Sequence, residues 1–473
     1  MKLCQLFLNC PKEMGQIDIK GITDDSRKVE DGYLFVCLKG PISDGHDYAK
    51  VAEEAGAAAI ICEKNVGVQS QIIVEDSHKA YAQICNSWFG NPTENLKIVG
   101  VTGTNGKTSV CFMLKHIFEF AGHKTGLIGT IQNMIGDEVL PSKNTTPGLF
   151  DLNCLFRKMA DAGCEYVVME VSSHSLDQRR VEGIQFEAGI FTNLTQDHLD
   201  YHKTMENYFK AKAKLFEKSK ISVINADDEY GKKLASIAKN KIVTYSVCSD
   251  ESTFSAKSIQ YRPNGVDYEL VGYGIIGRIN IKTVGKFSVY NSMAAAVCAE
   301  ELGFSISDIT EALGKIKGVK GRAEIVPTGK DFTVIIDYAH TPDGLQNILS
   351  AFKKCEKNRL IVLFGCGGDR DKSKRAKMGA VAARLSDKVI VTSDNPRSED
   401  PGAIISDILE GMKDIPTPYK VIENRVDAIK YAVANAKSGD IIVLAGKGHE
   451  TYQILKNETI HLDEREVVAM ALS

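Results

Sequence analysis

The chain of 473 residues lacks several features that would assign it to a specialised class of protein. No run of apolar residues approaches the ~18 to 20 needed to cross a bilayer, and the N-terminal apolar segment is too short and too soon interrupted for a signal peptide. The formal net charge is only −3, which provides no broad cationic field for nucleic acid. These absences predict a cytoplasmic protein with no membrane insertion and no nucleic-acid partner.

The cysteines form no metal-binding or disulfide pattern. There are 12 of them, without a Cys-x-x-Cys pair, and most have apolar neighbours, as Cys62, Cys111 and Cys298 do. We therefore expect reduced thiols in the protein interior. No short-period repeat or low-complexity tract is visible. Because the chain is longer than one hydrophobic core supports, we expect several domains.

The order of apolar runs and helical patterns predicts an α/β protein of three domains. Residues 1–95 have short β-rich runs around one alanine-rich helix, which indicates a small N-terminal α/β domain. Residues 96–320 alternate strands with helices, as a mostly parallel sheet requires, and residues 255–282 add a period-two pattern typical of an antiparallel edge. Residues 321–473 repeat the strand–helix rhythm and predict a doubly wound, Rossmann-like C-terminal domain.

A glycine-rich loop between a buried strand and a helix is the most specific local pattern. The sequence GTNGKTS follows the apolar strand 96–101 and precedes apolar residues at helical spacing. Amides at a helix N-terminus bind phosphate, Lys107 would reach the β- and γ-phosphates, and Thr108 would offer its hydroxyl to Mg²⁺. The general phosphate-loop pattern has glycine where this chain has Val101, so the match is to a shorter variant. A chance glycine-rich turn is the alternative.

Polar residues that follow the next strands predict a magnesium site beside this loop. Glu170 ends one strand, and residues 193–200 follow another. Hard oxygen ligands suit Mg²⁺, so Thr108 and Glu170 fit it, whereas His198 is a less usual ligand. A purely structural role for His198 is an equally good interpretation of the sequence.

Lys212 occupies an unusual position on its predicted helix. At ~100° per residue, Met205, Tyr208 and Phe216 lie within about 60° of Lys212, which places the lysine on the apolar face. A lysine there extends its ammonium to solvent, pairs with a buried carboxylate, or loses its proton and reacts. The periodicity alone favours the first outcome.

In the third domain, four strand ends carry polar residues. They are the segments 337–340, 365–371, 393–397 and 446–450. Ligands of open α/β sheets bind beyond the carboxyl ends of strands, arginine binds carboxylates, and Asp or Glu accepts from an ammonium. These four strand ends therefore predict a pocket for a zwitterionic amino acid. The alternative is that these residues only form turns.

Five motifs occur in the order found in the Mur ligases, and the chain resembles that family over all three predicted domains. They are GTNGKTS, EVSSH from Glu170, the stretch 193–202, DYAHTPD from Asp337, and DNPR from Asp394. The resemblance implies an ATP-dependent amide ligase of peptidoglycan precursor synthesis, with ATP and Mg²⁺ as cofactors. It acts through an acyl phosphate, and we expect a monomer.

The resemblance also implies roles for individual residues. The catalytic set is Lys107, Glu170, His198 and Lys212, and the metal set is Thr108, Glu170, His198 and Lys212, with Lys212 carbamylated to N6-carboxylysine. The ATP-binding set is Gly103, Thr104, Asn105, Gly106, Lys107, Thr108, Ser109, Asn291 and Arg322. One departure is Ser288, where the family usually has asparagine.

The substrates follow from the same resemblance. The residues implied for UDP-MurNAc-L-Ala-D-Glu are Ser26, Asn144, Thr145, Thr146, Ser172, Gln178 and Arg180. The DNPR motif is similar to that of members that add meso-diaminopimelate, in which arginine binds a carboxylate that lysine lacks. The implied set for this amino acid is Arg370, Asp394, Asn395, Pro396, Arg397, Gly446 and Glu450.

Two other functions remain to be compared with this one. A folylpolyglutamate synthase shares the ATP-binding and ligase domains, but it would not be expected to have the N-terminal domain with the Asp25-Ser26-Arg27 match or the DNPR motif. A phosphate-loop switch without enzymatic activity would bind nucleotide and signal to a partner, and it leaves Lys212 unexplained.

Overall fold

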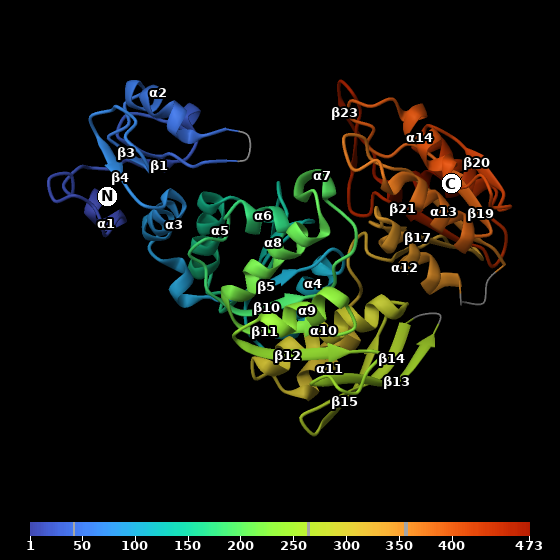
Figure 1. Cartoon of the computed structure of the whole chain (residues 1–473). Helices are drawn as coiled ribbons and strands as arrows, with labels where there is room; N and C mark the ends of the chain where they lie inside the picture. The colour runs from blue at the N-terminus through green and yellow to red at the C-terminus, as the bar shows by residue number, and fades with distance from the viewer. Residues whose placement is uncertain (41–42, 263–264, 354–357) are drawn as a thin grey trace.

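Three large sheets follow one another along the chain and define an α/β fold. The computed structural model describes residues 1–40, 43–262, 265–353 and 358–473. The largest sheet lies in the middle of an arc, with the N-terminal sheet at one end and the C-terminal sheet at the other (Figure 1). The three sheets lie within the ranges 1–95, 96–320 and 321–473, and the boundaries themselves stay predictions.

The N-terminal sheet has four parallel strands in the order β1-β2-β3-β4. Its elements are α1 (Leu3–Leu6), β1 (Gly21–Thr23), η1 (Ser26–Lys28), β2 (Tyr33–Val36), η2 (Gly45–Tyr48), α2 (Ala49–Glu54), β3 (Ala59–Cys62), β4 (Gln71–Ile73), α3 (Ser77–Trp88) and η3 (Pro92–Asn95). The predicted alanine-rich helix corresponds to η2 and α2. Asp76 caps α3 by accepting from the Lys79 amide, as an aspartate at an N-cap does.

The central sheet has eleven strands in the order β15-β14-β13-β12-β11-β10-β5-β9-β6-β7-β8. Its strands are β5 (Lys97–Thr102), β6 (Thr125–Ile128), β7 (Asn133–Ile135), β8 (Glu138–Leu140), β9 (Tyr166–Glu170), β10 (Phe186–Phe191), β11 (Ser219–Asn225), β12 (Lys241–Ser246), β13 (Phe254–Arg262), β14 (Gly265–Gly272) and β15 (Ile275–Ile281). The strands from β13 to β6 are parallel to their neighbours, and both ends of the sheet are antiparallel.

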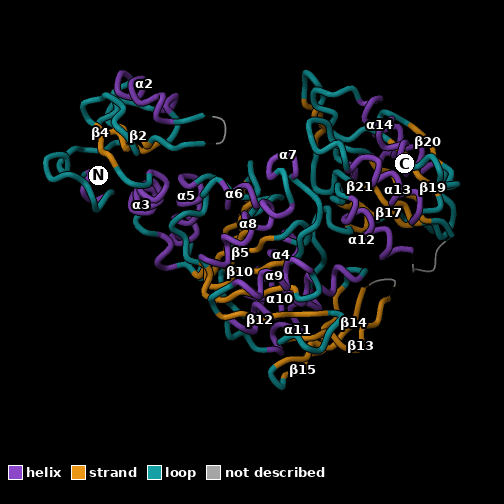
Figure 2. The backbone as a smooth tube through the Cα atoms, in the orientation of Figure 1, coloured by secondary structure: helices purple, strands orange, loops and turns teal. Residues whose placement is uncertain are grey.

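The antiparallel edge predicted for residues 255–282 is confirmed as β13–β15, which lie at the bottom of the molecule in Figure 2. The hairpin β7–β8 at the other end was not predicted, because its strands are only three residues long and their apolar alternation is too short to detect.

Helices cover both faces of the central sheet, as parallel strands require. On one face α4 (Lys107–Phe120), α10 (Lys286–Glu301) and α11 (Ile306–Lys315) share a buried core with Val99 and Val101. On the other face α5 (Leu149–Asp161), α8 (Met205–Glu217) and α9 (Glu229–Ile237) pack with Phe186 and Phe191. The short helices α6 (Ser173–Asp177) and α7 (Leu199–His202) follow strands β9 and β10.

The C-terminal sheet is doubly wound, in the order β16-β17-β21-β18-β19-β20. The elements of this part of the chain are β16 (Glu324–Val326), β17 (Thr333–Asp337), α12 (Pro342–Lys353), β18 (Leu360–Phe364), α13 (Lys374–Leu385), β19 (Lys388–Val391), α14 (Pro401–Glu410), β20 (Tyr419–Val421), α15 (Arg425–Ala434), β21 (Ile441–Ala445), β22 (Tyr452–Ile454), β23 (Thr459–His461) and α16 (Glu464–Leu472). Strands β22 and β23 pair with each other in a separate two-stranded sheet. Helices α12–α14 cover one face, and α15 and α16 cover the other.

The predicted strand–helix rhythm of this domain is confirmed, and β16 adds an antiparallel edge strand. Within the described ranges, no helix is long and apolar enough to cross a membrane.

Candidate active site

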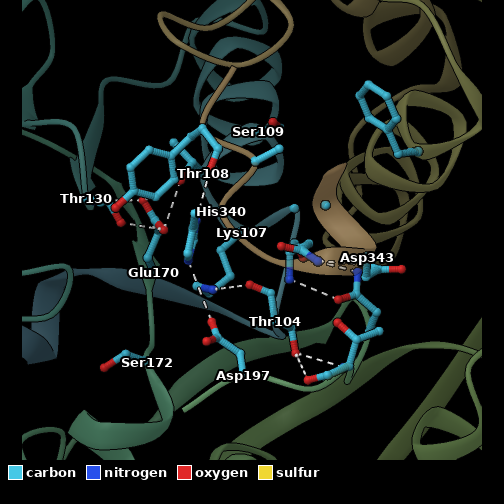
Figure 3. A pocket seen from close by; sticks show the side chains of 18 of the residues that line it. Thr104, Lys107, Thr108, Ser109, Thr130, Glu170, Ser172, Asp197, His340 and Asp343 are labelled. Atoms are coloured by element: carbon cyan, nitrogen blue, oxygen red, sulfur yellow. Dashed lines mark hydrogen bonds and ion pairs between the residues drawn. The ribbon is translucent and has the colours of Figure 1, made fainter. Parts of the chain in front are cut away.

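A cavity of about 710 Å³ opens between the central and C-terminal sheets. Its walls are formed by the phosphate loop, by the ends of β9 and β10, by α10 and by the start of α12. Of the predicted ATP-binding residues, all except Gly103 line it. Figure 3 shows Glu170, Thr130 and Thr108 on one side of the cavity and Asp343 on the other.

The phosphate loop joins β5 to α4 in a conformation that requires glycine. Gly106 has φ +90°, and a Cβ built on Gly103 would lie 1.9 Å from the Thr192 hydroxyl. Lys107 Nζ donates to the carbonyl oxygens of Gly103 and Thr104 at 2.9 and 2.8 Å. The first amides of α4 therefore open into the cavity at the positive end of the helix dipole, as a phosphate site requires.

The Glu170 carboxylate is buried, and two threonines hold it in place. The Thr108 hydroxyl lies 3.1 Å from both carboxylate oxygens, and Thr130 donates its amide and its hydroxyl at 2.8 and 3.0 Å. Hydroxyl and carboxylate oxygens are donors that Mg²⁺ prefers. Sequence reasoning missed Thr130, although it comes soon after strand β6, where the strand-end rule applies.

His198 lies in the cavity wall with a left-handed backbone, φ +54°. Its Nε2 is 3.3 Å from an Asp197 carboxylate oxygen, and its ring meets that of His174 edge-on. Although 42% of the side chain is accessible, desolvation by the cavity walls lowers the pKa of His198 to about 3. The imidazole is therefore neutral at physiological pH, which is the form that can bind a metal.

Lys212 lies on the buried face of α8, and its ammonium reaches the phosphate loop. The side chain is 2% exposed, Nζ donates to the Gly103 carbonyl at 2.8 Å, and the Tyr208 ring centroid is 4.6 Å away. Within the described residues, no carboxylate oxygen lies within 4.0 Å of this nitrogen. Burial lowers the pKa of Lys212 well below its usual value. The expectation from periodicity alone, that the ammonium extends to solvent, is wrong because the helix face packs against the loop.

Most of the predicted sugar–peptide set forms a continuous hydrogen-bonded wall. Thr145 contacts Thr130 at 3.0 Å, and Thr146 donates to the Glu170 carbonyl at 2.8 Å. Arg180 donates to the Thr146 carbonyl at 3.1 Å and also contacts the Gln178 side chain. The members that line the cavity are Asn144, Thr145, Thr146, Ser172 and Arg180. Gln178 is not part of the lining, and its Oε1 accepts from the Arg180 guanidinium. Ser26 begins η1 in the N-terminal part of the chain and is also outside the lining.

The predicted amino-acid set forms a cluster of its own at the ends of β19 and β21. Asn395 donates to Glu450 at 3.0 Å, and Arg397 donates to the Gly368 carbonyl at 2.8 Å. A Cβ on Gly446, where φ is +114°, would lie 2.6 Å from an Asp394 oxygen. Of the predicted set, only Arg370 lines the large cavity; Asp394, Asn395, Pro396, Arg397, Gly446 and Glu450 lie outside its lining.

Tyr338 lies in the cavity wall on the side toward this amino-acid cluster. Its ring lies 4.5 Å below the Arg322 guanidinium, and its ring centroid is 5.0 Å from that of His449. Burial first, and then the charge of Glu450, raise the pKa of Tyr338. Tyr338 and Arg370 both line the cavity, so the cavity extends to the edge of the amino-acid cluster.

Side chains of the two sheets meet across the cavity. Asn105 Nδ2 donates to Asp343 at 2.8 Å, and Arg322 donates to the Thr108 hydroxyl at 3.0 Å. Asn291 lies against the loop, since a Cβ on Gly106 would be 2.4 Å from its Oδ1. An Asp197 carboxylate oxygen is 3.7 Å from His340 Nε2, and both side chains are labelled in Figure 3. Sequence reasoning did not single out Asp197, His340 or Asp343, because their role depends on how the two sheets are placed.

The fold and the cavity define a multidomain α/β protein of the phosphate-loop class. Three family descriptions match the chain: "Mur ligase family, catalytic domain" over residues 18–89, "Mur ligase middle domain" over residues 101–299, and "Mur ligase, glutamate ligase domain" over residues 321–448. The chain belongs to the Mur ligase family.

Similar proteins cover almost the whole chain. A UDP-N-acetylmuramoyl-L-alanyl-D-glutamate–2,6-diaminopimelate ligase of Caldanaerobacter subterraneus subsp. tengcongensis is 49% identical over 97% of this chain and 95% of its own length. A protein of the same name from Clostridium perfringens is 50% identical over 95% and 94%. A solved structure of a ligase of this name has a TM-score of 0.73 at 31% identity and covers 100% of this chain and 98% of its own.

A folylpolyglutamate synthase of Mycobacterium tuberculosis, solved with ADP, shares the fold with a TM-score of 0.64. It is 19% identical and covers 78% of this chain and 92% of its own. This likeness is in fold alone.

Proposed function

We propose that this protein uses ATP to join meso-2,6-diaminopimelate to the D-glutamyl carboxylate of UDP-MurNAc-L-Ala-D-Glu. The proposal rests on the cavity, whose lining combines the phosphate loop, Glu170 and Lys212 with the hydrogen-bonded wall of the predicted sugar–peptide set. The amino-acid cluster lies next to this cavity, and its member Arg370 is part of the lining. The names of the relatives above support the same reaction.

The first step is transfer of the γ-phosphoryl group of ATP to an oxygen of the substrate carboxylate. Such a transfer needs positioning and charge neutralisation more than covalent help from the protein. Lys107 and the amides of residues 104–109 supply positive charge at the phosphates. Arg322, which contacts the Thr108 hydroxyl, supplies a second cation from the C-terminal side.

The second step is attack of the diaminopimelate amine on the carbonyl carbon of the acyl phosphate. A C–N bond forms, the C–O bond to phosphate breaks and inorganic phosphate leaves. The ammonium gives one proton to solvent before the attack, and the nitrogen gives a second proton to solvent as the amide forms. Glu450 and Arg397 of the amino-acid cluster would hold the ammonium and the carboxylate of the far end of diaminopimelate, so that the amine of the other end faces the cavity.

Thr108, Glu170, His198 and a carbamylated Lys212 would hold Mg²⁺. The Thr108–Glu170 pair is a fixed set of hard oxygen atoms of the kind that Mg²⁺ prefers, and a neutral His198 imidazole can bind a metal. Within the described residues, no three His, Cys, Asp or Glu side chains form a metal-binding group by themselves, so the proposed site needs the Thr108 hydroxyl and the carbamate. A lowered lysine pKa favours the neutral amine that reacts with CO₂, and the carbamate replaces a buried cation by an oxygen ligand. Bound Mg²⁺ would neutralise charge on the phosphates.

The test is to mix the protein with ATP, Mg²⁺, the UDP-muramoyl dipeptide and single amino acids, and to measure phosphate release. We expect release with meso-diaminopimelate and little with lysine. Activity with lysine alone would overturn the amino-acid assignment. Release with a folate and glutamate would favour the synthase, and nucleotide binding without release in any mixture would favour the switch. The cytoplasmic location and the monomeric state remain predictions from the sequence.

A further inference from the structure

Lys447 is a buried cation in the amino-acid cluster that none of the roles described above uses. It follows β21, between Gly446 and Gly448, and its side chain is 0% exposed. A lysine is almost never fully buried unless its charge is paired. The contacts of this ammonium therefore show what it is paired with.

All three N–H groups of the Lys447 ammonium have acceptors. Nζ lies 2.5 Å from Asn395 Oδ1, 3.1 Å from Glu450 Oε2 and 2.7 Å from the Tyr452 carbonyl oxygen. An Asp394 carboxylate oxygen is 3.9 Å away. Three of these four partners, Asp394, Asn395 and Glu450, are residues that we expect to bind the amino acid.

The lysine holds the Glu450 carboxylate in one orientation. Glu450 Oε2 accepts from Lys447 and from Asn395, whereas no described residue donates a hydrogen bond to Oε1. Oε1 is thus the oxygen left for a substrate ammonium. Asn395 is held in turn, because its Oδ1 accepts from Lys447 and from the Ile454 amide.

The cluster has a net formal charge of +1 when Lys447 is included. Asp394 and Glu450 contribute two negative charges, and Lys447, Arg370 and Arg397 contribute three positive charges. The far end of diaminopimelate carries an ammonium and a carboxylate and is neutral, whereas the far end of lysine carries an ammonium alone. The excess positive charge therefore disfavours the cationic end of lysine, and without Lys447 the cluster would have no net charge and would disfavour it less.

We propose that Lys447 is a specificity-determining positioning residue, whose buried ammonium balances Asp394 and Glu450 and so disfavours lysine as substrate. This inference rests on the proposed function, since it requires that the cluster binds the amino acid. Binding sites commonly gain selectivity from charges that are unfavourable for the competing ligand.

The test compares kcat/KM for meso-diaminopimelate and for lysine on the same enzyme preparation. The ratio of the two values does not depend on the fraction of folded enzyme. In Lys447→Gln, which keeps a hydrogen-bond donor but no charge, we expect the ratio to fall about tenfold or more, with the KM for ATP unchanged. Lys447→Arg keeps the charge and should keep the preference for diaminopimelate. The matched control is Lys420→Gln, which removes an exposed lysine of β20 in the same sheet.

Three results would overturn the inference: an unchanged ratio in Lys447→Gln, an equal fall in Lys447→Arg, or an equal fall in the control. If Lys447→Gln yields no active enzyme, the same ratio is measured in the double variant Lys447→Met/Glu450→Gln. This variant removes one positive and one negative charge, so the net charge of the cluster equals that of the wild type. It should retain the preference for diaminopimelate, and a preference for lysine would refute the role of charge. Wild-type enzyme that releases no phosphate with either amino acid would instead refute the proposed function.

Discussion

The Lys212 ammonium donates a hydrogen bond to the Gly103 carbonyl across 2.8 Å, and this contact joins helix α8 to the phosphate loop. A buried lysine with a lowered pKa thus lies within reach of the residues that would surround the phosphates. A chemical change at the Lys212 nitrogen would therefore also change a hydrogen bond that holds the phosphate loop.

Replacing Lys212 should abolish most of the activity. In Lys212→Met the buried nitrogen is lost while the apolar stem is retained, and we expect kcat to fall about 100-fold or more because the proposed oxygen ligand cannot form. The exposed neighbour Lys210, on the opposite face of α8, provides the control Lys210→Met. Wild-type activity should rise with added bicarbonate after CO₂ removal, and a bicarbonate-independent wild type would argue against the carbamate.

The activity should depend on the hydroxyl of Thr108 more than on the shape of its side chain. Thr108→Val removes the donor to Glu170 and the acceptor for Arg322, and we expect kcat to fall about 100-fold, as is typical when a charge-stabilising polar group is lost. Thr108→Ser should retain most of the activity. Thr244→Val, which loses hydrogen bonds to Thr253 outside the cavity, is the control in the same phosphate-release assay. Equal losses in both valine variants would show a general folding effect.

Arg397→Ala should raise the KM for diaminopimelate at least about tenfold, because a charge-assisted contact to its distal carboxylate is lost. The KM for ATP should not change, since Arg397 is outside the lining of the large cavity. Arg384→Ala, an exposed arginine of α13, serves as the control. An unchanged KM for diaminopimelate in Arg397→Ala would remove this residue from the site.

The ion pair between Asp76 and Arg179 should make stability depend on pH. Burial alone would raise the pKa of Asp76, but the hydrogen bonds from Arg179 and from the Lys79 amide, together with the charges of these two cations, outweigh it, and the pKa lies below its usual value of 3.8. The unfolded chain therefore binds a proton at higher pH than the folded chain. The stabilisation is complete above the usual pKa and is lost as the pH falls through the lowered one.

Asp76→Asn isolates this charge, because asparagine also caps a helix. We expect the variant to lose about 1 kcal/mol of stability at neutral pH, measured as a lower Tm, and to match the wild type in acid. A Tm difference that persists at low pH would mean that the loss comes from packing and not from charge.

The fold and the phosphate loop could be predicted because their signals are local. Buried parallel strands are apolar runs, and the GTNGKTS loop needs glycine for its backbone, so both are readable from neighbouring residues. The roles of Asp197, Asp343 and Lys447 depend on residues more than fifty positions away. Lys447 was visible as part of a polar strand end, yet its partners Asn395 and Glu450 come together only because β19 and β21 lie on either side of β18 in the folded sheet.

The hydrogen bond from Asn105 to Asp343 has a thermodynamic consequence. It joins the loop that would meet ATP to the helix α12 of the sheet that would meet the amino acid. A ligand that binds more tightly to the conformation in which this hydrogen bond is formed raises the population of that conformation. It thereby raises the affinity of every other ligand that prefers the same conformation. If nucleotide and amino acid both prefer this arrangement, each raises the affinity for the other by the same factor, through one amide and one carboxylate.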